Sequence, residues 1–419
     1  MSPNILRSAS RLTGGLHPVG RATSRVALVS TYPPTMCGLA TFTSSLRDAL
    51  AAVRGSSEQL DVFAVLEGAA DGIRRPEVVG TLDPADPFTV RNAAAAMSRY
   101  DVVILQHEYG IWGPNMGLPV VDLVNRLDAP LLTTLHTVLP SPTELQTRIV
   151  EALSSKSAYT IVPTRVAGEL LSIRYSVEPR RVEVIPHGTD PYLRSVAALR
   201  EQYRVSGRRL LTWGLIGPGK GLEWAIRAVA LARRSYPDIV YTIAGKTHPK
   251  VAELHGESYR RSLEALVASL DLDRNVRFVD EYISPALLRN LLAEAAVVVL
   301  PYDSSEQVVS GVLVEAIAAN VPLIATAFPH AVELADMGAV QVVPHRDADA
   351  IAQSIEELLG SQTTAEQMIS AQRALAPDLD WGSVAASYER LMERVVAGTL
   401  QLNPVPPASG VPASTRPHR

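Results

Sequence analysis

Cysteine is almost absent from this sequence, and long apolar runs are absent as well. Cys37 is the single cysteine in 419 residues, which excludes an intrachain disulfide and a thiolate metal cluster. No apolar run reaches the length of a membrane span. The first 25 residues carry four arginines and no acid, but they lack the apolar core of a signal peptide. These absences predict a cytoplasmic protein.

The chain also lacks a basic stripe. Its net charge is −4 at pH 7, which argues against nucleic acid as a partner. Residues 1–25 are expected to form a disordered leader, and weak contact of this leader with an anionic membrane is the alternative. The tail at 400–419 is rich in Pro, Ser and Gly and is expected to be disordered too. Nothing in the sequence indicates an oligomeric state.

What the chain does contain is an alternation of short apolar runs and helix-like segments. With 47% hydrophobic and 20% charged residues over this length, it can form two globular domains with sizeable cores. Alternation of this kind predicts α/β domains with parallel sheets. We expect a first domain at 26–195, a second at 205–380, and a separate helix at 381–398.

The stretch from Val297 to Thr326 combines a buried strand with a helix start. Val297–Leu300 is apolar and β-branched, which is typical of a strand in a parallel sheet. Ser310 suits the N-cap of the helix that follows, and Gly311 would let a ligand approach the backbone closely. Unpaired N–H groups at a helix start attract phosphates. Ser310, Gly311 and Val312 are therefore candidate phosphate ligands.

Glu315 lies about one turn after Gly311, on the same face of the expected helix. A carboxylate there would repel a phosphate, but it would accept hydrogen bonds from a diol such as a ribose. A buried strand–helix unit in which Glu315 only stabilises the helix start explains the same residues. These residues alone do not separate the two interpretations.

A glycine-rich loop follows the expected strand at 209–215. Gly217, Gly219 and Gly221 surround Lys220, so the loop can wrap a diphosphate with backbone N–H groups and neutralise it with the ammonium. The spacing does not match a P-loop, which needs Ser or Thr after the lysine. A surface turn with a solvated lysine is the alternative.

Residues that follow strands in the first domain supply further candidates. Gly38 comes after the expected strand Val26–Ser30 and precedes a helix, which is again an arrangement that suits phosphate. Cys37 beside it is assigned to packing. His136 directly follows the strand at 130–135, and ligands of open parallel sheets bind at that end of a strand. It could hydrogen-bond a substrate or assist proton transfer.

Polar and aromatic residues gather in the loop after the strand at 102–106. The residues there are His107, Glu108, Tyr109 and Trp112, and they resemble a sugar-binding lip because aromatic faces stack on the C–H surface of a pyranose. An ordinary folded loop is a nearly equal explanation. His187 ends a later strand at 182–186, and Gly245 ends the strand at 239–245 in the second domain.

Taken in chain order, these segments resemble the retaining glycosyltransferases of family 4. The resemblance covers about 26–397 and rests on six motifs in the family's order: Gly38, His136, IPHGTD at 185–190, GLIGPGKG at 214–221, IAG at 243–245 and the unit at 297–326. It implies the GT-B fold, in which two Rossmann-like domains face a central cleft. The final helix is then expected to cross back to the first domain.

Two positions depart from the family's pattern. Gln307 stands where members usually carry a glutamate that reaches the donor sugar, and Leu215 stands where an arginine usually contacts the diphosphate. A neutral Gln307 can still hydrogen-bond sugar hydroxyls. Losing one of two cations could weaken diphosphate binding by on the order of a few kcal/mol.

The resemblance implies transfer of a hexosyl group, mannosyl or glucosyl, from a GDP- or UDP-sugar to a hydroxyl of a carbohydrate or lipid acceptor. The implied catalytic residues are His136, Lys220 and Gln307. Donor contacts are implied for Gly38, Gly217, Gly219, Lys220, Gly245, Ser310, Gly311, Val312 and Glu315, and sugar or acceptor contacts for His107, Tyr109, Trp112 and His187. The nucleotide sugar is a cosubstrate, and neither a cofactor nor a metal is implied. The alternatives are a catalytically silent nucleotide-sugar binding protein and an epimerase or phosphorylase on the same fold.

Overall fold

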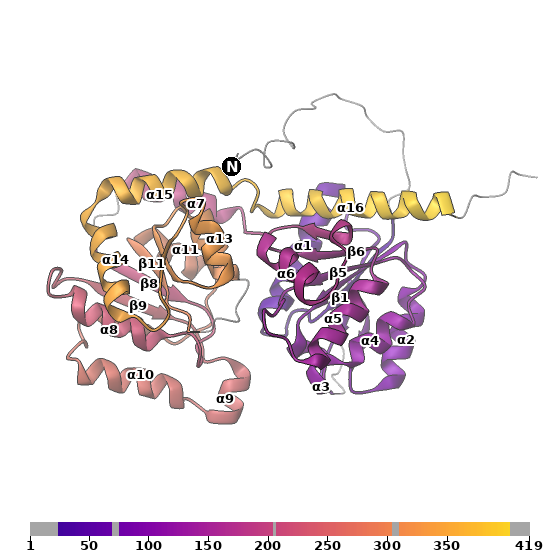
Figure 1. Cartoon of the computed structure of the whole chain (residues 1–419), viewed down its shortest axis with the longest axis horizontal. Coiled ribbons are helices and arrows are strands. Elements are labelled where there is room, and N and C mark those ends of the chain that lie inside the picture. Colours follow the sequence, from indigo (N-terminus) through magenta and orange to yellow (C-terminus); the bar gives the residue numbers. More distant parts are fainter. Residues whose placement is uncertain (1–23, 69–74, 204–206, 304–309, 403–419) are drawn as a thin grey trace, which may run out of the picture.

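The computed structural model describes residues 24–68, 75–203, 207–303 and 310–402. Two α/β domains lie beside each other, and the last helix, α16 (Trp381–Leu402), runs back along the first of them (Figure 1). Most of the predicted leader and tail, residues 1–23 and 403–419, lies outside the described residues. Within the described part of the chain, no helix has both the length and the apolarity that crossing a bilayer requires.

The first domain is built on a parallel sheet whose described strands have the order β3-β2-β1-β4-β5-β6-β7. These strands are β1 (Val26–Ser30), β2 (Leu60–Val65), β3 (Val78–Leu82), β4 (Val102–His107), β5 (Leu131–Leu135), β6 (Tyr159–Val162) and β7 (Val182–Val184). The helices around it are α1 (Gly38–Arg54), α2 (Pro87–Met97), α3 (Pro114–Gly117), α4 (Pro119–Asn125), α5 (Glu144–Lys156) and α6 (Arg165–Arg174), with 3-10 turns η1 (Tyr109–Ile111) and η2 (Pro179–Arg181). Every residue of β1, β4 and β5 is buried, as expected of strands covered on both faces.

The second domain repeats this design with the strand order β10-β9-β8-β11-β12-β13 among its described residues. Its strands are β8 (Arg209–Trp213), β9 (Val240–Ala244), β10 (Val276–Val279), β11 (Val297–Leu300), β12 (Leu323–Thr326) and β13 (Gln341–Val343). Its helices are α7 (Tyr192–Tyr203), α8 (Leu222–Ala232), α9 (Pro249–His255), α10 (Ser258–Ser269), α11 (Pro285–Glu294), α12 (Gly311–Ala318), α13 (Pro329–Ala335), α14 (Ala348–Gly360) and α15 (Gln362–Leu375). The helix α7 spans the predicted domain boundary, and its Leu193 and Val196 belong to the core of the second domain.

In both sheets the strand order reverses at a central pair of strands. The first strand of the first domain, β1, pairs with β2 on one side and with β4 on the other. In the second domain β8 pairs in the same way with β9 and β11. Ligands of such sheets bind at this switch point, beyond the carboxyl ends of the strands. The fold therefore offers one such position in each domain.

The return of α16 to the first domain follows from an apolar stripe at helical spacing. Trp381, Val384, Tyr388, Leu391 and Val395 are all buried and recur every three or four residues. They belong to one core cluster with residues of β1, β2 and α1. The final helix, which follows the second domain in sequence, therefore packs on the first domain, as the resemblance implies.

Polar contacts between α13 and α6 and between α9 and η1 join the two domains. The Glu333 carboxylate of α13 accepts hydrogen bonds from the backbone N–H groups of Arg165 (3.2 Å) and Val166 (3.1 Å), at the first turn of α6. The Lys250 ammonium of α9 donates to the carbonyl oxygen of Gly110 at 3.0 Å. Glu333 thus satisfies N–H groups that have no partner within their own helix.

Several strand predictions are confirmed to the residue, whereas one edge strand was missed. Val26–Ser30 and Val297–Leu300 form strands with the predicted ends. The helix predicted to follow Ser310 runs from Gly311 to Ala318, and Asn320 beyond its end has a left-handed φ of 52°. The strand β3 was not predicted because Gly80 interrupts a short run at the sheet edge. A Cβ at Gly80 would lie 2.7 Å from the Phe63 ring.

Candidate functional site

A cavity of about 760 Å³ lies between the two domains, and residues of both line it. From the first domain and α16 it is lined by Cys37, Gly38, Leu39, Thr41, Phe42, Ser45, Glu108, His136, Thr137, His187, Gly188, Asp190 and Trp381. From α7 and the second domain it is lined by Tyr192, Trp213, Gly214, Leu215, Lys220, Gly245, Lys246, His248, Tyr282, Ile283, Pro285, Leu288, Tyr302, Ser310, Gly311, Val312 and Glu315. Most of these residues follow the ends of strands, where the topology places ligands.

The start of α12 forms one wall of this cavity. Ser310 is the N-cap, and its hydroxyl oxygen accepts a hydrogen bond from the Leu313 N–H at 3.2 Å. Gly311 and Val312, the first residues of the helix, line the cavity as well. N–H groups in the first turn of a helix have no intrahelical partner and carry the positive end of its dipole. This wall can therefore bind an anion such as a phosphate.

Lys220 lies next to the same helix start. Its Nζ is 4.3 Å from the centroid of the Tyr302 ring, and the Tyr302 hydroxyl lies 3.4 Å from the Ser310 Oγ. The close packing of the lysine loop depends on Gly221, which has a φ of +61°. A Cβ there would lie 1.9 Å from the Pro301 carbonyl oxygen. A phosphate in the cavity can thus meet an ammonium and a helix start together.

Glu315 lines the same cavity from α12, about one helical turn after Gly311. Its Oε2 accepts a hydrogen bond from the Trp213 indole N–H at 3.0 Å. Burial raises the pKa of Glu315 to about 7, although the Trp213 bond opposes the shift and Asp190 adds to it. The other carboxylate oxygen remains available to accept hydrogen bonds from a ligand.

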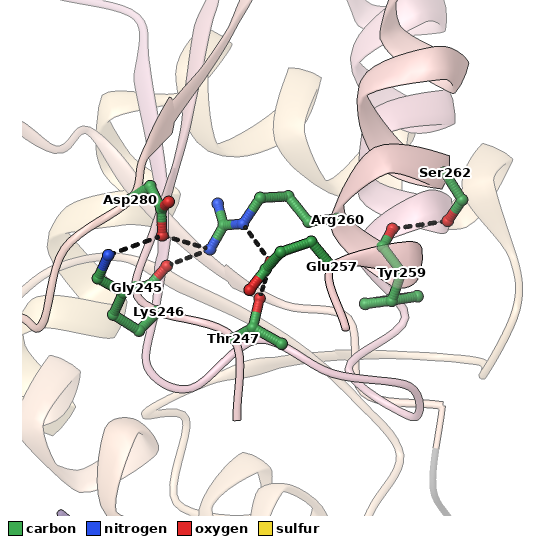
Figure 2. Close-up of polar contacts among 8 residues, drawn as sticks. All are labelled: Gly245, Lys246, Thr247, Glu257, Tyr259, Arg260, Ser262 and Asp280. Carbon is green, nitrogen blue, oxygen red and sulfur yellow. Dashed lines mark hydrogen bonds and ion pairs between the residues drawn. The ribbon is translucent and has the colours of Figure 1, made fainter. Parts of the chain in front are cut away.

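The loops after β9 and β10 are held by a buried arginine, shown in Figure 2. The Arg260 guanidinium donates to the Gly245 carbonyl oxygen at 2.7 Å and contacts the Asp280 carboxylate at 3.0 Å. Gly245 itself has a φ of +145°, and a Cβ there would lie 1.8 Å from the Gly214 carbonyl oxygen. Arg260 therefore holds both loops in place. These loops contribute Gly245, Lys246 and Tyr282 to the lining of the cavity.

His136 faces the cavity from the end of β5. Its Nε2 lies 2.8 Å from the Gln106 side-chain oxygen. Because an amide oxygen can only accept, the proton sits on Nε2, and Nδ1 is left as an acceptor. Burial lowers the pKa of His136 to about 3, with small further effects of His187 and His107. The ring is thus neutral and supplies a lone pair rather than a proton.

His187 reaches from the first domain toward the start of α12. Its Nδ1 lies 2.7 Å from the Gly188 carbonyl oxygen, which can only accept, so Nε2 is the unprotonated nitrogen. That Nε2 lies 3.3 Å from the place of a Cβ on Gly311. Burial lowers the pKa of His187, and the backbone bond only partly offsets this. A side chain at position 311 would therefore press on His187.

The predicted aromatic lip is wrong, because its side chains form part of the core. Trp112 and His107 have no exposed surface, and Tyr109 is buried as well. The Trp112 indole N–H donates to the Gln106 carbonyl oxygen at 3.1 Å. Aromatic faces enclosed by the domain cannot stack on a sugar.

The predicted donor residues fall into three groups. Gly38, Lys220, Gly245, Ser310, Gly311, Val312 and Glu315 line the cavity, as do His136 and His187. Gly217 and Gly219 shape the lysine loop but are not among the lining residues: Gly219 has a φ of +86°, and its carbonyl oxygen accepts from the Asp303 N–H at 2.9 Å. Gln307 lies outside the described residues.

Some cavity residues escaped sequence analysis. Trp213 ends an apolar strand and is typical of a core residue, although its N–H holds Glu315. Glu108 was grouped with the aromatic residues of its loop but was not chosen as a site residue, although it lines the cavity. Cys37 was assigned to packing, whereas its Sγ accepts from the Ala40 N–H and caps α1. Across the described residues, no group of three or more His, Cys, Asp or Glu side chains is placed to hold a metal ion.

Replacing His107 by leucine is expected to flatten the pH dependence of stability. Burial holds the pKa of His107 at about 3, against 6.5 in the unfolded chain. Its stabilising effect is therefore present above pH 6.5 and is lost as the pH falls toward 3. When the pH is lowered from 7.5 to 5.0, the free energy of unfolding of the wild type should fall by about 2 kcal/mol more than that of the variant. Urea unfolding at the two pH values measures this difference.

The exposed His255 provides the matched control for this comparison. The free energy of unfolding of His255→Leu should change between the two pH values as much as that of the wild type does. An identical pH dependence in the wild type and in His107→Leu would contradict the burial of a neutral His107.

Two protein families match this chain in sequence. The family described as Glycosyltransferase Family 4 matches residues 40–193, and that described as glycosyl transferases group 1 matches residues 200–375. A phosphatidyl-myo-inositol mannosyltransferase of Mycolicibacterium smegmatis is 26% identical over 275 residues. The aligned part is 64% of this chain and 66% of that protein, slightly less than two thirds of it.

Solved structures share the fold at low sequence identity. HepE of Anabaena, solved in complex with UDP-glucose, has a TM-score of 0.67 and 18% identity, with 90% of this chain and 99% of that chain covered. Sucrose-phosphate synthase of Thermosynechococcus elongatus has a TM-score of 0.66 and 20% identity, with 90% and 100% covered. Likenesses this distant establish the architecture alone. The two family matches show that this chain is a glycosyltransferase with a family 4 domain followed by a group 1 domain, and the shared architecture is that of the GT-B fold.

Proposed function

We propose that this protein is a retaining glycosyltransferase that moves a mannosyl or glucosyl group from a GDP- or UDP-sugar to a hydroxyl acceptor. The observation that carries the proposal is the meeting of Lys220, Tyr302 and the start of α12 at the interdomain cavity. This arrangement binds a diphosphate, which is the leaving group of a nucleotide sugar. The mannosyltransferase relative and the UDP-glucose complex of HepE agree with a hexosyl donor.

In the proposed reaction the bond between the anomeric carbon and the diphosphate oxygen breaks while the acceptor oxygen bonds to the same carbon. Negative charge grows on the leaving diphosphate, where the Lys220 ammonium and the amides of Gly311 and Val312 stabilise it. The acceptor's proton passes to a leaving phosphate oxygen. No nucleophile from the protein is then required.

The remaining cavity residues orient the two substrates. Glu315 would accept hydrogen bonds from the ribose diol while Trp213 holds its second oxygen. The loops fixed by Arg260 would contact the base through backbone atoms. His136 is neutral, and its Nδ1 would accept a hydrogen bond from a hydroxyl of the transferred sugar. Gln307, which lies outside the described residues, would orient the donor sugar through hydrogen bonds to the sugar hydroxyls.

A nucleotide-sugar binding protein without turnover is a second candidate, and Leu215 favours it. This residue lines the cavity at the position where the family usually places an arginine. The second domain still supplies Lys246 to the cavity, although its ammonium lies 3.6 Å from the Asp280 carboxylate. Diphosphate binding therefore rests mainly on Lys220 and the helix start.

Thermal-shift measurements with UDP, GDP and ADP and their glucose and mannose conjugates test the proposal. A diphosphate bound at a hundredfold excess over its Kd should add about 2.7 kcal/mol to the free energy of unfolding. UMP and GMP, which lack the second phosphate, should stabilise the protein much less. Transfer of label from the stabilising sugar nucleotide to an acceptor would then establish the enzyme.

The outcomes separate the alternatives. Stabilisation without any transfer would favour the silent binding protein, and phosphate-dependent cleavage of a glycan would favour a phosphorylase. An absence of stabilisation by every diphosphate would contradict the proposed function.

A further inference from the structure

The two sides of the interdomain cavity differ in their cationic side chains. The described lining residues of the second domain include the cations Lys220 and Lys246 as well as Glu315. Those of the first domain, where the acceptor would bind opposite the donor, include Glu108 and Asp190 but neither lysine nor arginine. The histidines on that side, His136 and His187, have pKa values lowered by burial and stay neutral.

Glu108 is held in place at the end of β4. The Thr137 hydroxyl, at the end of β5, donates to its Oε2, and the Tyr109 backbone N–H donates to its Oε1 at 3.0 Å. The backbone N–H of His136 donates to the His107 carbonyl oxygen at 3.0 Å, so the two strand ends are joined directly beside this carboxylate. Each carboxylate oxygen accepts one bond from the protein and keeps a further lone pair.

The surroundings of Glu108 suit hydroxyl groups and oppose phosphate. The same side of the cavity is lined by three residues with hydroxyl groups, Thr41, Ser45 and Thr137. Phe42 lines it as well. A fixed carboxylate accepts hydrogen bonds from neighbouring hydroxyls, whereas it repels a phosphate dianion. Burial raises the pKa of Glu108, and the hydrogen bonds from Thr137 and from the Tyr109 backbone N–H oppose this shift by favouring the carboxylate.

We infer that Glu108 selects an uncharged polyhydroxyl acceptor, such as an unphosphorylated sugar or a cyclitol, and disfavours acceptors phosphorylated near the reacting hydroxyl. This inference rests on the proposed function and narrows its acceptor. The carboxylate binds two hydroxyls of the acceptor, and Thr137 keeps it oriented. His136 lies beside it on the neighbouring strand end.

The test compares matched neutral and phosphorylated acceptors with the labelled donor that stabilises the protein. The probes are methyl α-mannoside, methyl α-glucoside, myo-inositol and mannotriose against mannose 6-phosphate, glucose 6-phosphate and myo-inositol 1-phosphate. We expect kcat/KM for the neutral acceptors to be at least tenfold higher. In Glu108→Gln the acceptor KM of the neutral probes should rise at least tenfold, and the preference over the phosphates should fall by a similar factor.

Two further variants keep the result interpretable. Glu144→Gln removes an exposed glutamate of α5 and should change neither the acceptor KM nor the preference. Thr137→Val keeps the carboxylate but removes the hydroxyl that orients it, so the acceptor KM should rise without a change in the preference for neutral probes. This variant carries the test should Glu108→Gln fail to fold.

A preference for the phosphorylated probes, or an acceptor KM unchanged by Glu108→Gln, would overturn the inference while leaving the proposed function intact. Donor binding without transfer to any neutral probe would overturn it as well. Failure to bind any nucleotide sugar, measured by thermal shift on the same samples, would instead overturn the proposed function.

Discussion

Replacing Lys220 by alanine is expected to lower kcat with the preferred nucleotide sugar by about 10²–10³-fold, the usual cost of removing one group that stabilises the charge of a leaving group. The effect is large because Leu215 supplies no second cation at the diphosphate. The variant should unfold nearly as the wild type does, since the contact of Nζ with the Tyr302 ring contributes only about 0.5–1 kcal/mol. Initial rates of nucleotide release at saturating donor measure this loss.

The controls for Lys220 separate charge from shape. Lys220→Arg keeps the positive charge and should retain more activity than Lys220→Ala. Lys156→Ala removes an exposed lysine of α5 and should match the wild type in rate. Full turnover by Lys220→Ala would show that the diphosphate is not held by this ammonium.

Replacing Glu315 by alanine is expected to weaken donor binding by about ten- to a hundredfold. The change removes a charge-assisted hydrogen bond of about 1.5–3 kcal/mol to the ribose, and it leaves the Trp213 indole N–H without its partner. The binding should also acquire a different selectivity. The wild type should bind the ribonucleotide at least tenfold more tightly than its 2′-deoxy analogue, whereas Glu315→Ala should bind both alike.

The pH dependence of binding gives a second signature of Glu315. Its pKa is raised to about 7 by burial, so the carboxyl becomes protonated as the pH falls below that value. A protonated carboxyl accepts hydrogen bonds less well, and donor affinity should therefore decline from pH 8 to pH 6 in the wild type. Glu315→Gln keeps the shape without the titration and should show a flat profile. Equal discrimination against the 2′-deoxy analogue in Glu315→Ala and the wild type would refute the ribose contact.

The elements around the donor site were predictable because their residues obey local rules. The four apolar residues of Val297–Leu300, the N-cap Ser310 and the left-handed Asn320 each follow from the chemistry of single residues. The glycine-rich loop around Lys220 could likewise be placed before a helix. Long-range packing then brought Lys220 to Ser310 through the ring of Tyr302, which no local pattern encodes.

The acceptor side was harder to predict, because burial depends on the whole domain. Trp112 and Tyr109 have the composition of a sugar-binding loop, yet both side chains turn into the core beneath η1. Glu108 directly precedes Tyr109 in the same segment and lines the cavity instead. Alternation of side chains along a loop without regular structure has no fixed period, so the sequence could not decide which residues would be exposed. The Trp213–Glu315 bond was missed for a related reason, since a tryptophan ending a buried strand resembles a core residue.

A crystal structure of the protein with the preferred nucleoside diphosphate tests the central claim most directly. The account predicts that both phosphates lie in the interdomain cavity, within hydrogen-bond distance of the Lys220 ammonium and of the backbone N–H groups of Gly311 or Val312. The ribose should meet Glu315 on the same helix. A diphosphate bound elsewhere, or bound in the cavity with neither the ammonium nor the helix start in contact, would contradict the account.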